Sequence, residues 1–210
     1  MTVLIALAVR PTADLSPYLL MGADSLKINV STDFKELTRD EDATKIHKIN
    51  NKLVSMAGRI DTNFMEHFLD FVRENDTEIS DLSQKCLDYI KEFVSSDEAH
   101  EDTRFAVYIG SCENRTPKLA YLEVKKIDLP NHKLQVMEPP EVDSFAPGYA
   151  GSFKFPEDDD LTTDFEQRVI NNCFNRNLTC VKKAARDFLI NAASRYPETC
   201  NQNIKIEVLR

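Results

Sequence analysis

The spacing of apolar residues along this 210-residue chain alternates between the pattern of strands and the pattern of helices, and this alternation constrains the fold most strongly. The first segment, Val3–Val9, is a continuous apolar run, and a second run, Tyr18–Asp24, follows it. Short apolar runs of this composition are typical of strands buried on both faces. Because the loop between the runs contains Pro11 and Pro17, we expect the two strands to form a hairpin.

Further strands are expected before the pattern changes. Leu26–Val30 predicts a short strand, and the polar stretch Ser31–Asp42 follows it. Lys45–Ile49 and Lys52–Met56 flank an Asn-Asn pair, and residues of alternating polarity around such a pair predict a second hairpin.

After Gly58 the apolar residues take up the 3.6-residue spacing of helices. One amphipathic helix is marked by Phe64 and Phe68, and a second by Leu82 and Ile90. Strands and a helix pair then recur: we expect strands at Phe105–Gly110, Leu119–Val124 and Leu134–Met137, helices around Phe165–Cys173 and Val181–Ala192, and a last strand at Ile204–Leu209.

Blocks of strands joined by helix pairs do not have the strand-helix alternation of a parallel sheet. We therefore expect an α+β fold, a four-layer αββα sandwich. In it two mainly antiparallel sheets stack face to face, and a helix pair covers each outer face. No linker composition interrupts the chain, so residues 1–210 are expected to form a single domain.

Two segments carry no strand or helix pattern. Pro139–Pro156 holds most of the Pro and Gly of its region, and the acidic run Glu157–Asp160 is expected to be a solvated loop. The acidic run lacks the Gly and the distal Glu of a calcium-binding EF-hand loop. The sequence therefore predicts no cation site there.

The composition excludes several classes of function. The 26 Lys and Arg against 35 Asp and Glu leave a net charge of −9, which disfavours a nucleic-acid partner. The run Val3–Val9 is far shorter than the roughly 20 apolar residues that span a bilayer, so we expect no membrane association and a cytoplasmic protein. The 5 cysteines form no C-x-x-C pair and the histidines have no ligand spacing, so neither a metal nor another cofactor is predicted.

Four short motifs follow one another in an order that a known family shares. They are Thr2-Val3 at the start of a strand, Gly22-Ala23-Asp24-Ser25 at the end of the next, Lys45-Ile46-His47-Lys48-Ile49-Asn50, and Ser55-Met56-Ala57-Gly58 before a helix. Over nearly its whole length the chain resembles the proteasome β-subunit and HslV-type peptidase family of N-terminal-nucleophile hydrolases.

The chemistry of such a site constrains the first residue of the mature chain. A threonine hydroxyl is a weak nucleophile until a base takes its proton, and a free α-amine with a pKa of about 8 can serve as that base. Thr2 meets this requirement only after Met1 is removed.

The resemblance implies a role for each further site residue. It makes Thr2 the nucleophile, Asp24 the carboxylate that orients the site, Lys45 the cation that activates the hydroxyl and Gly58 the backbone donor to the oxyanion. Ser152 would support Thr2 from a turn that the family usually builds as Gly-Ser-Gly.

The chain departs from the family pattern before its last strand. Where the family has Arg-Asp-x-x-Ser-Gly, this sequence has Tyr196 for the aspartate, Thr199 for the serine and Cys200 for the glycine. We expect the Tyr196 hydroxyl to take over the hydrogen bonding of the missing aspartate. In the turn around Ser152, Phe153 replaces the second glycine, and Arg59 stands where active members often carry a glycine.

Three functions are compatible with this pattern. The resemblance implies a threonine peptidase that hydrolyses peptides or unfolded proteins inside a homo-oligomeric ring, fed by an ATP-dependent unfoldase. A catalytically inactive ring or scaffold subunit and an N-terminal-nucleophile amidase acting on a small molecule remain open as alternatives.

Overall fold

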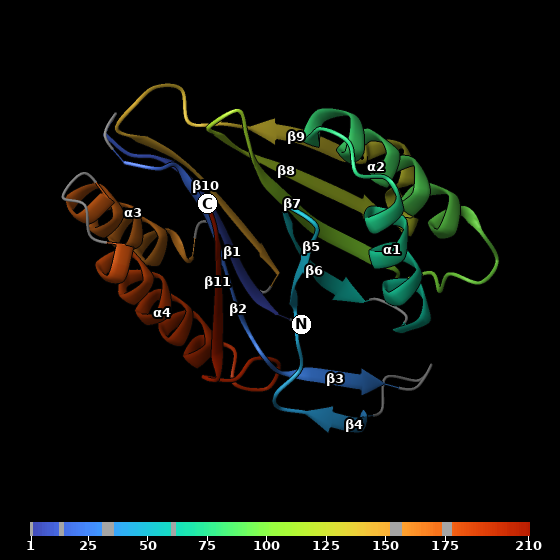
Figure 1. Cartoon of the computed structure of the whole chain (residues 1–210). Helices are drawn as coiled ribbons and strands as arrows, with labels where there is room; N and C mark the ends of the chain where they lie inside the picture. The colour runs from blue at the N-terminus through green and yellow to red at the C-terminus, as the bar shows by residue number, and fades with distance from the viewer. Residues whose placement is uncertain (1, 13–14, 31–35, 60–61, 152–156, 174–177) are drawn as a thin grey trace.

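The computed structural model describes residues 2–12, 15–30, 36–59, 62–151, 157–173 and 178–210. Two large sheets stack against each other (Figure 1). Helices α1 (Thr62–Glu74) and α2 (Ile79–Ser95) cover the outer face of one sheet, and α3 (Asp159–Cys173) and α4 (Leu178–Arg195) cover the outer face of the other. The predicted αββα sandwich is confirmed.

The first sheet has the strand order β10-β1-β2-β11, with every pairing antiparallel. Its strands are β1 (Val3–Arg10), β2 (Tyr18–Asp24), β10 (Ser144–Gly151) and β11 (Ile204–Leu209). Alternate residues of β1 pack against α3 and α4 on one side and against the second sheet on the other. This two-sided burial explains why β1 and β2 are continuous apolar runs.

The second sheet has the order β5-β6-β7-β8-β9 and is also antiparallel. Its strands are β5 (Ile46–Ile49), β6 (Lys52–Arg59), β7 (Arg104–Glu113), β8 (Thr116–Lys125) and β9 (Lys133–Met137), with a short 3-10 helix at Lys126–Asn131 before the last. The predicted turn at the Asn-Asn pair is present, and a second tight turn joins β7 to β8. Asn50 has a φ of 50° in the first, and Asn114 and Arg115 have φ values of 49° and 64° in the second.

Two strands were not predicted. β4 (Glu36–Asp40) pairs with β3 (Lys27–Val30) in a small separate sheet, and its residues are all exposed, so no apolar alternation marks it. β10 lies in the Pro- and Gly-rich segment; it is the edge strand beside β1, where Pro147 is tolerated.

The acidic run was predicted wrongly as a solvated loop. Asp159 and Asp160 begin α3, where carboxylates favour the positive end of the helix dipole. Asp158 is only 1% exposed and receives a hydrogen bond from Arg195 Nη1 at 2.9 Å. The sequence alone could not show this partner, which lies at the far end of α4.

The two sheets approach each other closely at β10. A Cβ atom on Gly148 would lie 2.7 Å from the ring of Tyr108 on β7, so no larger residue fits there without displacement. The Tyr108 hydroxyl donates a hydrogen bond to the Tyr149 carbonyl at 3.1 Å. This contact joins the sheets across the sandwich.

Candidate active site

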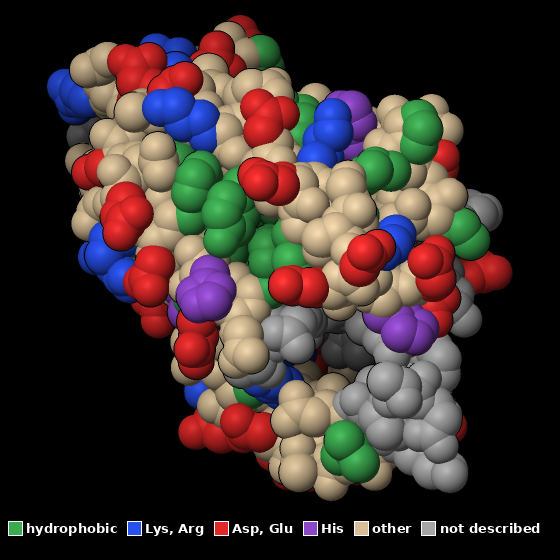
Figure 2. All heavy atoms as spheres, turned by 90° about the vertical axis from the view of Figure 1, so that its right-hand side faces the viewer, with side chains coloured by type: hydrophobic (Ala, Val, Ile, Leu, Met, Phe, Trp, Pro, Cys, Tyr) green, Lys and Arg blue, Asp and Glu red, His purple; other side chains and the backbone are tan. Residues whose placement is uncertain are grey.

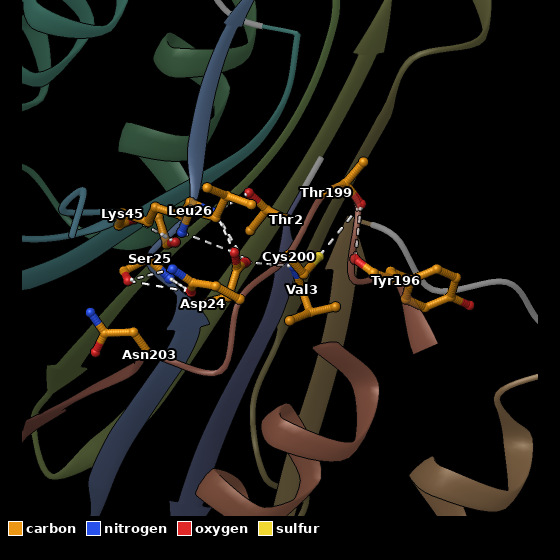
Figure 3. A network of polar contacts seen from close by, with 12 residues as sticks. Thr2, Val3, Asp24, Ser25, Leu26, Lys45, Tyr196, Thr199, Cys200 and Asn203 are labelled. Carbon is orange, nitrogen blue, oxygen red and sulfur yellow. Dashed lines mark hydrogen bonds and ion pairs between the residues drawn. The ribbon is translucent and has the colours of Figure 1, made fainter. Parts of the chain in front are cut away.

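Antiparallel pairing gathers three chain segments at one end of the first sheet. Thr2 immediately precedes β1, Asp24 ends β2, and Gly151 ends β10 opposite Val3. Lys45 reaches the same place from the residue before β5, which belongs to the second sheet. The motif residues therefore meet where the two sheets join (Figure 3).

The Asp24 carboxylate is the buried centre of this group. Its side chain accepts the backbone N–H of Val3 at 2.9 Å and that of Leu26 at 3.1 Å, and both oxygens lie 3.0 Å from Lys45 Nζ. Asp24 is only 1% exposed. These contacts tie the start of β1, the segment after β2 and Lys45 to one side chain.

Lys45 connects Asp24 to Thr2. Lys45 Nζ donates to Thr2 Oγ1 at 2.7 Å while it pairs with the carboxylate, as the dashed lines in Figure 3 show. The Ser55 hydroxyl donates to the Lys45 carbonyl at 2.7 Å and fixes the backbone. Burial lowers the pKa of Lys45, and the charge and hydrogen bonding of Asp24 partly oppose that shift.

Gly58 faces Thr2 across a cavity of about 240 Å³. Its φ is 135°, and a Cβ there would lie 2.1 Å from the Arg104 carbonyl oxygen, so the backbone requires glycine. Gly151 closes the cavity on another side with a φ of 102°, where a Cβ would lie 1.8 Å from the Thr2 carbonyl oxygen. Gly151 thus lets the backbone approach Thr2 closely, and Gly58 lets β6 approach Arg104 of β7 closely.

The structure thus brings together Thr2, Asp24, Lys45 and Gly58. Ser152 and Met1, the other two residues in the expected chemistry, lie outside the described residues. The chemical roles of these residues remain predictions.

Tyr196 does not take the place that the sequence predicted for it. Its hydroxyl donates to Asp158 Oδ2 at 2.6 Å, and the side chain points away from Thr2 (Figure 3). Burial and this carboxylate raise the pKa of Tyr196 to about 12. The expectation that its hydroxyl replaces the missing aspartate beside Thr2 is therefore wrong, because a buried carboxylate elsewhere captures it.

Thr199 and Cys200 lie closer to the site, with their own side chains 3.7 Å apart. The next residue, Asn201, was missed by the sequence analysis. Its side-chain oxygen accepts the Ser25 backbone N–H at 3.1 Å, and its nitrogen donates to the Glu41 carbonyl at 2.9 Å. Asn201 thereby ties the approach to β11 to the end of β2. No local sequence pattern could predict the contact between Ser25 and Asn201, because 176 residues separate them.

The far wall of the cavity was also missed. β7 contributes Arg104 and Ala106, and β8 contributes Tyr121, Glu123 and Lys125. In β8 these polar residues alternate with buried Ala120, Leu122 and Val124. This alternation of polar and apolar residues could have identified the polar face of β8 from the sequence. It could not have shown that this face lines a cavity beside Thr2.

Two further properties concern the described part of the chain. No cluster of three or more His, Cys, Asp or Glu side chains there could hold a metal ion. None of the helices within it has the length and apolar character needed to cross a membrane.

No protein-family model matches the sequence, and no curated protein matches it. Two solved structures cover nearly all of the chain. Eukaryotic HslV from Trypanosoma brucei aligns with 98% of this chain and 99% of its own at 16% identity and a TM-score of 0.49. Thiobacillus denitrificans BPH in complex with epoxomicin aligns over 98% of both chains at 12% identity and a TM-score of 0.54.

At identities of 12% and 16%, a structural match shows the fold alone. The second structure, with a TM-score above 0.5 over nearly the whole chain, has the same overall fold. At that level the resemblance predicted from the sequence is confirmed: the chain has the fold of Thiobacillus denitrificans BPH.

Proposed function

We propose that this protein is a threonine peptidase in which Thr2, freed of Met1, is the nucleophile. The observation that carries the proposal is the 2.7 Å hydrogen bond between Lys45 Nζ and Thr2 Oγ1, made by a lysine that is itself paired with a buried aspartate. A cation this close to a hydroxyl stabilises the negative charge that develops on the oxygen when it acts as a nucleophile.

The reaction would run in two stages. The Thr2 α-amine takes the hydroxyl proton while Oγ1 bonds to the carbonyl carbon of the peptide, and the oxyanion formed accepts the Gly58 N–H. The carbon–nitrogen bond then breaks, and the departing amine takes the proton held by the α-ammonium. Water, deprotonated by the same amine, hydrolyses the resulting ester and restores the Thr2 hydroxyl.

Lys45 and Asp24 would make the hydroxyl reactive. The Lys45 ammonium stabilises negative charge developing on Thr2 Oγ1, which lowers the pKa of that hydroxyl. Because burial disfavours the charged lysine, the Asp24 carboxylate is needed to keep it protonated. Ser152 would act as a supporting hydroxyl in this scheme.

The proposal also covers the substrate and the assembly of the protein. We propose that the protein cleaves peptides or unfolded proteins, that copies of the chain assemble into a closed ring, and that an ATP-dependent unfoldase delivers substrates to it. A cytoplasmic location is part of the same proposal. The fold shared with Thiobacillus denitrificans BPH supports these assignments.

Intact mass spectrometry and a matched pair of variants test the chemistry. The natural protein should lack Met1, and Thr2→Ala should lose cleavage of quenched-fluorescence peptides by at least about 10²-fold. Thr179→Ala, an exposed threonine of α4, should cleave like the wild type. Retention of Met1 in all molecules, or a Thr2→Ala variant that still cleaves, would overturn the proposal.

A second candidate is a ring subunit that binds without cleaving. It is favoured by Tyr196, which stands where the family has an aspartate. The Tyr196 hydroxyl bonds Asp158, so this position supplies no carboxylate to Thr2. A protein that loses Met1 and assembles, yet cleaves no peptide, would support this candidate over the first.

A further inference from the structure

The wall of the cavity opposite Thr2 carries an excess of positive charge. Arg104 and Lys125 line it, and Glu123, two residues before Lys125 in β8, adds a carboxylate. Lys133, on β9, adds a third cation within 3.2 Å of Glu123. Because the whole chain has a net charge of −9, this local excess of cations runs against its composition.

Glu123 is already satisfied by its neighbours. Lys125 Nζ lies 2.6 Å from its carboxylate, Lys133 Nζ 3.2 Å and the Tyr121 hydroxyl 3.1 Å. Burial opposes its ionisation, but hydrogen bonds from these three residues outweigh burial and lower the pKa of Glu123. The carboxylate therefore stays charged and is held by the lysines.

Arg104 has no such partner within the described parts of the chain, where no carboxylate bonds its guanidinium. In the ladder it stands directly opposite Lys125 of β8. Like charges opposite one another destabilise a sheet. An anion bound at this row would relieve that repulsion, and a guanidinium can hold a carboxylate through two parallel hydrogen bonds.

We propose that this cavity binds a carboxylate of the substrate, with Arg104 as its principal ligand. The inference rests on the proposed peptidase function, because the cavity adjoins Thr2 and Gly58. It assigns a substrate class: peptides that carry an acidic group close to the cleaved bond. The carboxylate can come from an Asp or Glu side chain or from the free C-terminus of a short peptide.

Matched quenched-fluorescence peptides separate these sources. One set places Glu, Gln or Lys at each position flanking the cleaved bond, and another ends in a free carboxylate or an amide just beyond it. We expect kcat/KM to be about tenfold higher for the acidic member of the preferred pair than for its neutral counterpart. A preference in the first set identifies a side chain, and one in the second identifies the C-terminus.

Variants connect the preference to Arg104. Arg104→Gln should reduce it to about twofold or less, Arg104→Lys should leave an intermediate value, and Arg104→Glu should favour the Lys peptide. Lys182→Gln, which removes an exposed charge from α4, should keep the wild-type preference. High salt should weaken the preference, since the cations are partly exposed.

Binding separates failure of this inference from failure of the peptidase proposal. Fluorescence anisotropy of the same peptides with Thr2→Ala needs no cleavage. Tighter binding of the acidic peptides, lost in the Thr2→Ala and Arg104→Gln double variant, supports the cavity assignment even if the wild type cleaves nothing. Equal binding and equal cleavage of acidic and neutral peptides would overturn it.

Discussion

Among single residues, Lys45 has the largest set of consequences, because it is the shared partner of a buried carboxylate and a hydroxyl. Its ammonium balances Asp24, which is almost completely buried. Removing one member of such a pair costs more than the pair itself contributes, since the remaining charge stays buried without its partner. Lys45 is therefore a stability residue as well as a proposed activator.

Replacing Lys45 with methionine should show both roles. We expect Lys45→Met to lower the free energy of unfolding by about 3 kcal/mol, measured by urea denaturation, and to lower peptide cleavage by at least about 10²-fold. Lys48→Met is the matched control, since Lys48 lies in β5 and is exposed. A Lys45→Met variant as stable and active as this control would contradict the described ion pair.

The lowered pKa of Lys45 sets a pH dependence of activity. The rate of cleavage should rise as the Thr2 α-amine becomes neutral near pH 8. It should then fall at higher pH as Lys45 loses its proton, at a pH below the ordinary lysine pKa of about 10.4. Lys45→Arg, if it cleaves, should move the alkaline decline upward, because arginine stays charged. An unchanged alkaline decline in that variant would remove Lys45 from the mechanism.

Stability should change in the opposite direction over the same range. Between the lowered pKa of Lys45 and about 10.4, the unfolded chain binds more protons than the folded chain, so this residue's contribution to the free energy of unfolding rises with pH. Denaturation curves across this window, compared with Lys45→Met, therefore distinguish loss of the lysine charge from loss of the fold.

At the scale of elements, the connection from α4 to β11 decides what reaches the site. Asp158 at the start of α3 binds both Arg195 and Tyr196, which anchors the end of α4 to the start of α3. This anchor directs Tyr196 outward, whereas Thr199 and Cys200 lie on the side of Thr2 and Asp24 (Figure 3).

Tyr196→Phe tests the anchor. It removes one hydrogen bond to a buried carboxylate, so we expect a loss of about 1–2 kcal/mol in the free energy of unfolding. Cleavage by Thr2 should be unchanged, because the hydroxyl points away from it. Tyr89→Phe is the control, as no residue that the structure describes hydrogen-bonds that hydroxyl. A selective loss of activity in Tyr196→Phe would contradict this placement.

At the scale of the whole molecule, the charge affects association of the chain with itself. Acidic side chains are spread over the face seen in Figure 2, in keeping with the net charge of −9. Like-charged subunits repel one another at low salt, and salt screens that repulsion. The proposed ring should therefore form more completely as ionic strength rises.

Native mass spectrometry and sedimentation at about 50 and 500 mM salt test this expectation. We expect closed assemblies at integer multiples of the 24.0 kDa subunit, with a larger assembled fraction at the higher salt concentration. A monomer at both salt concentrations and at high protein concentration would contradict the ring.

The sequence by itself determined the layers of this protein, and its resemblance to a known family predicted which residues lie beside Thr2. Residues buried on one or both faces repeat with the period of their element, so β1, β2 and the helix pairs could be predicted from local spacing. Only the tertiary structure decided the partners of Tyr196, Asp158 and Asn201 and the cationic wall around Arg104. Those features depend on contacts between residues far apart in the chain, which no local period encodes.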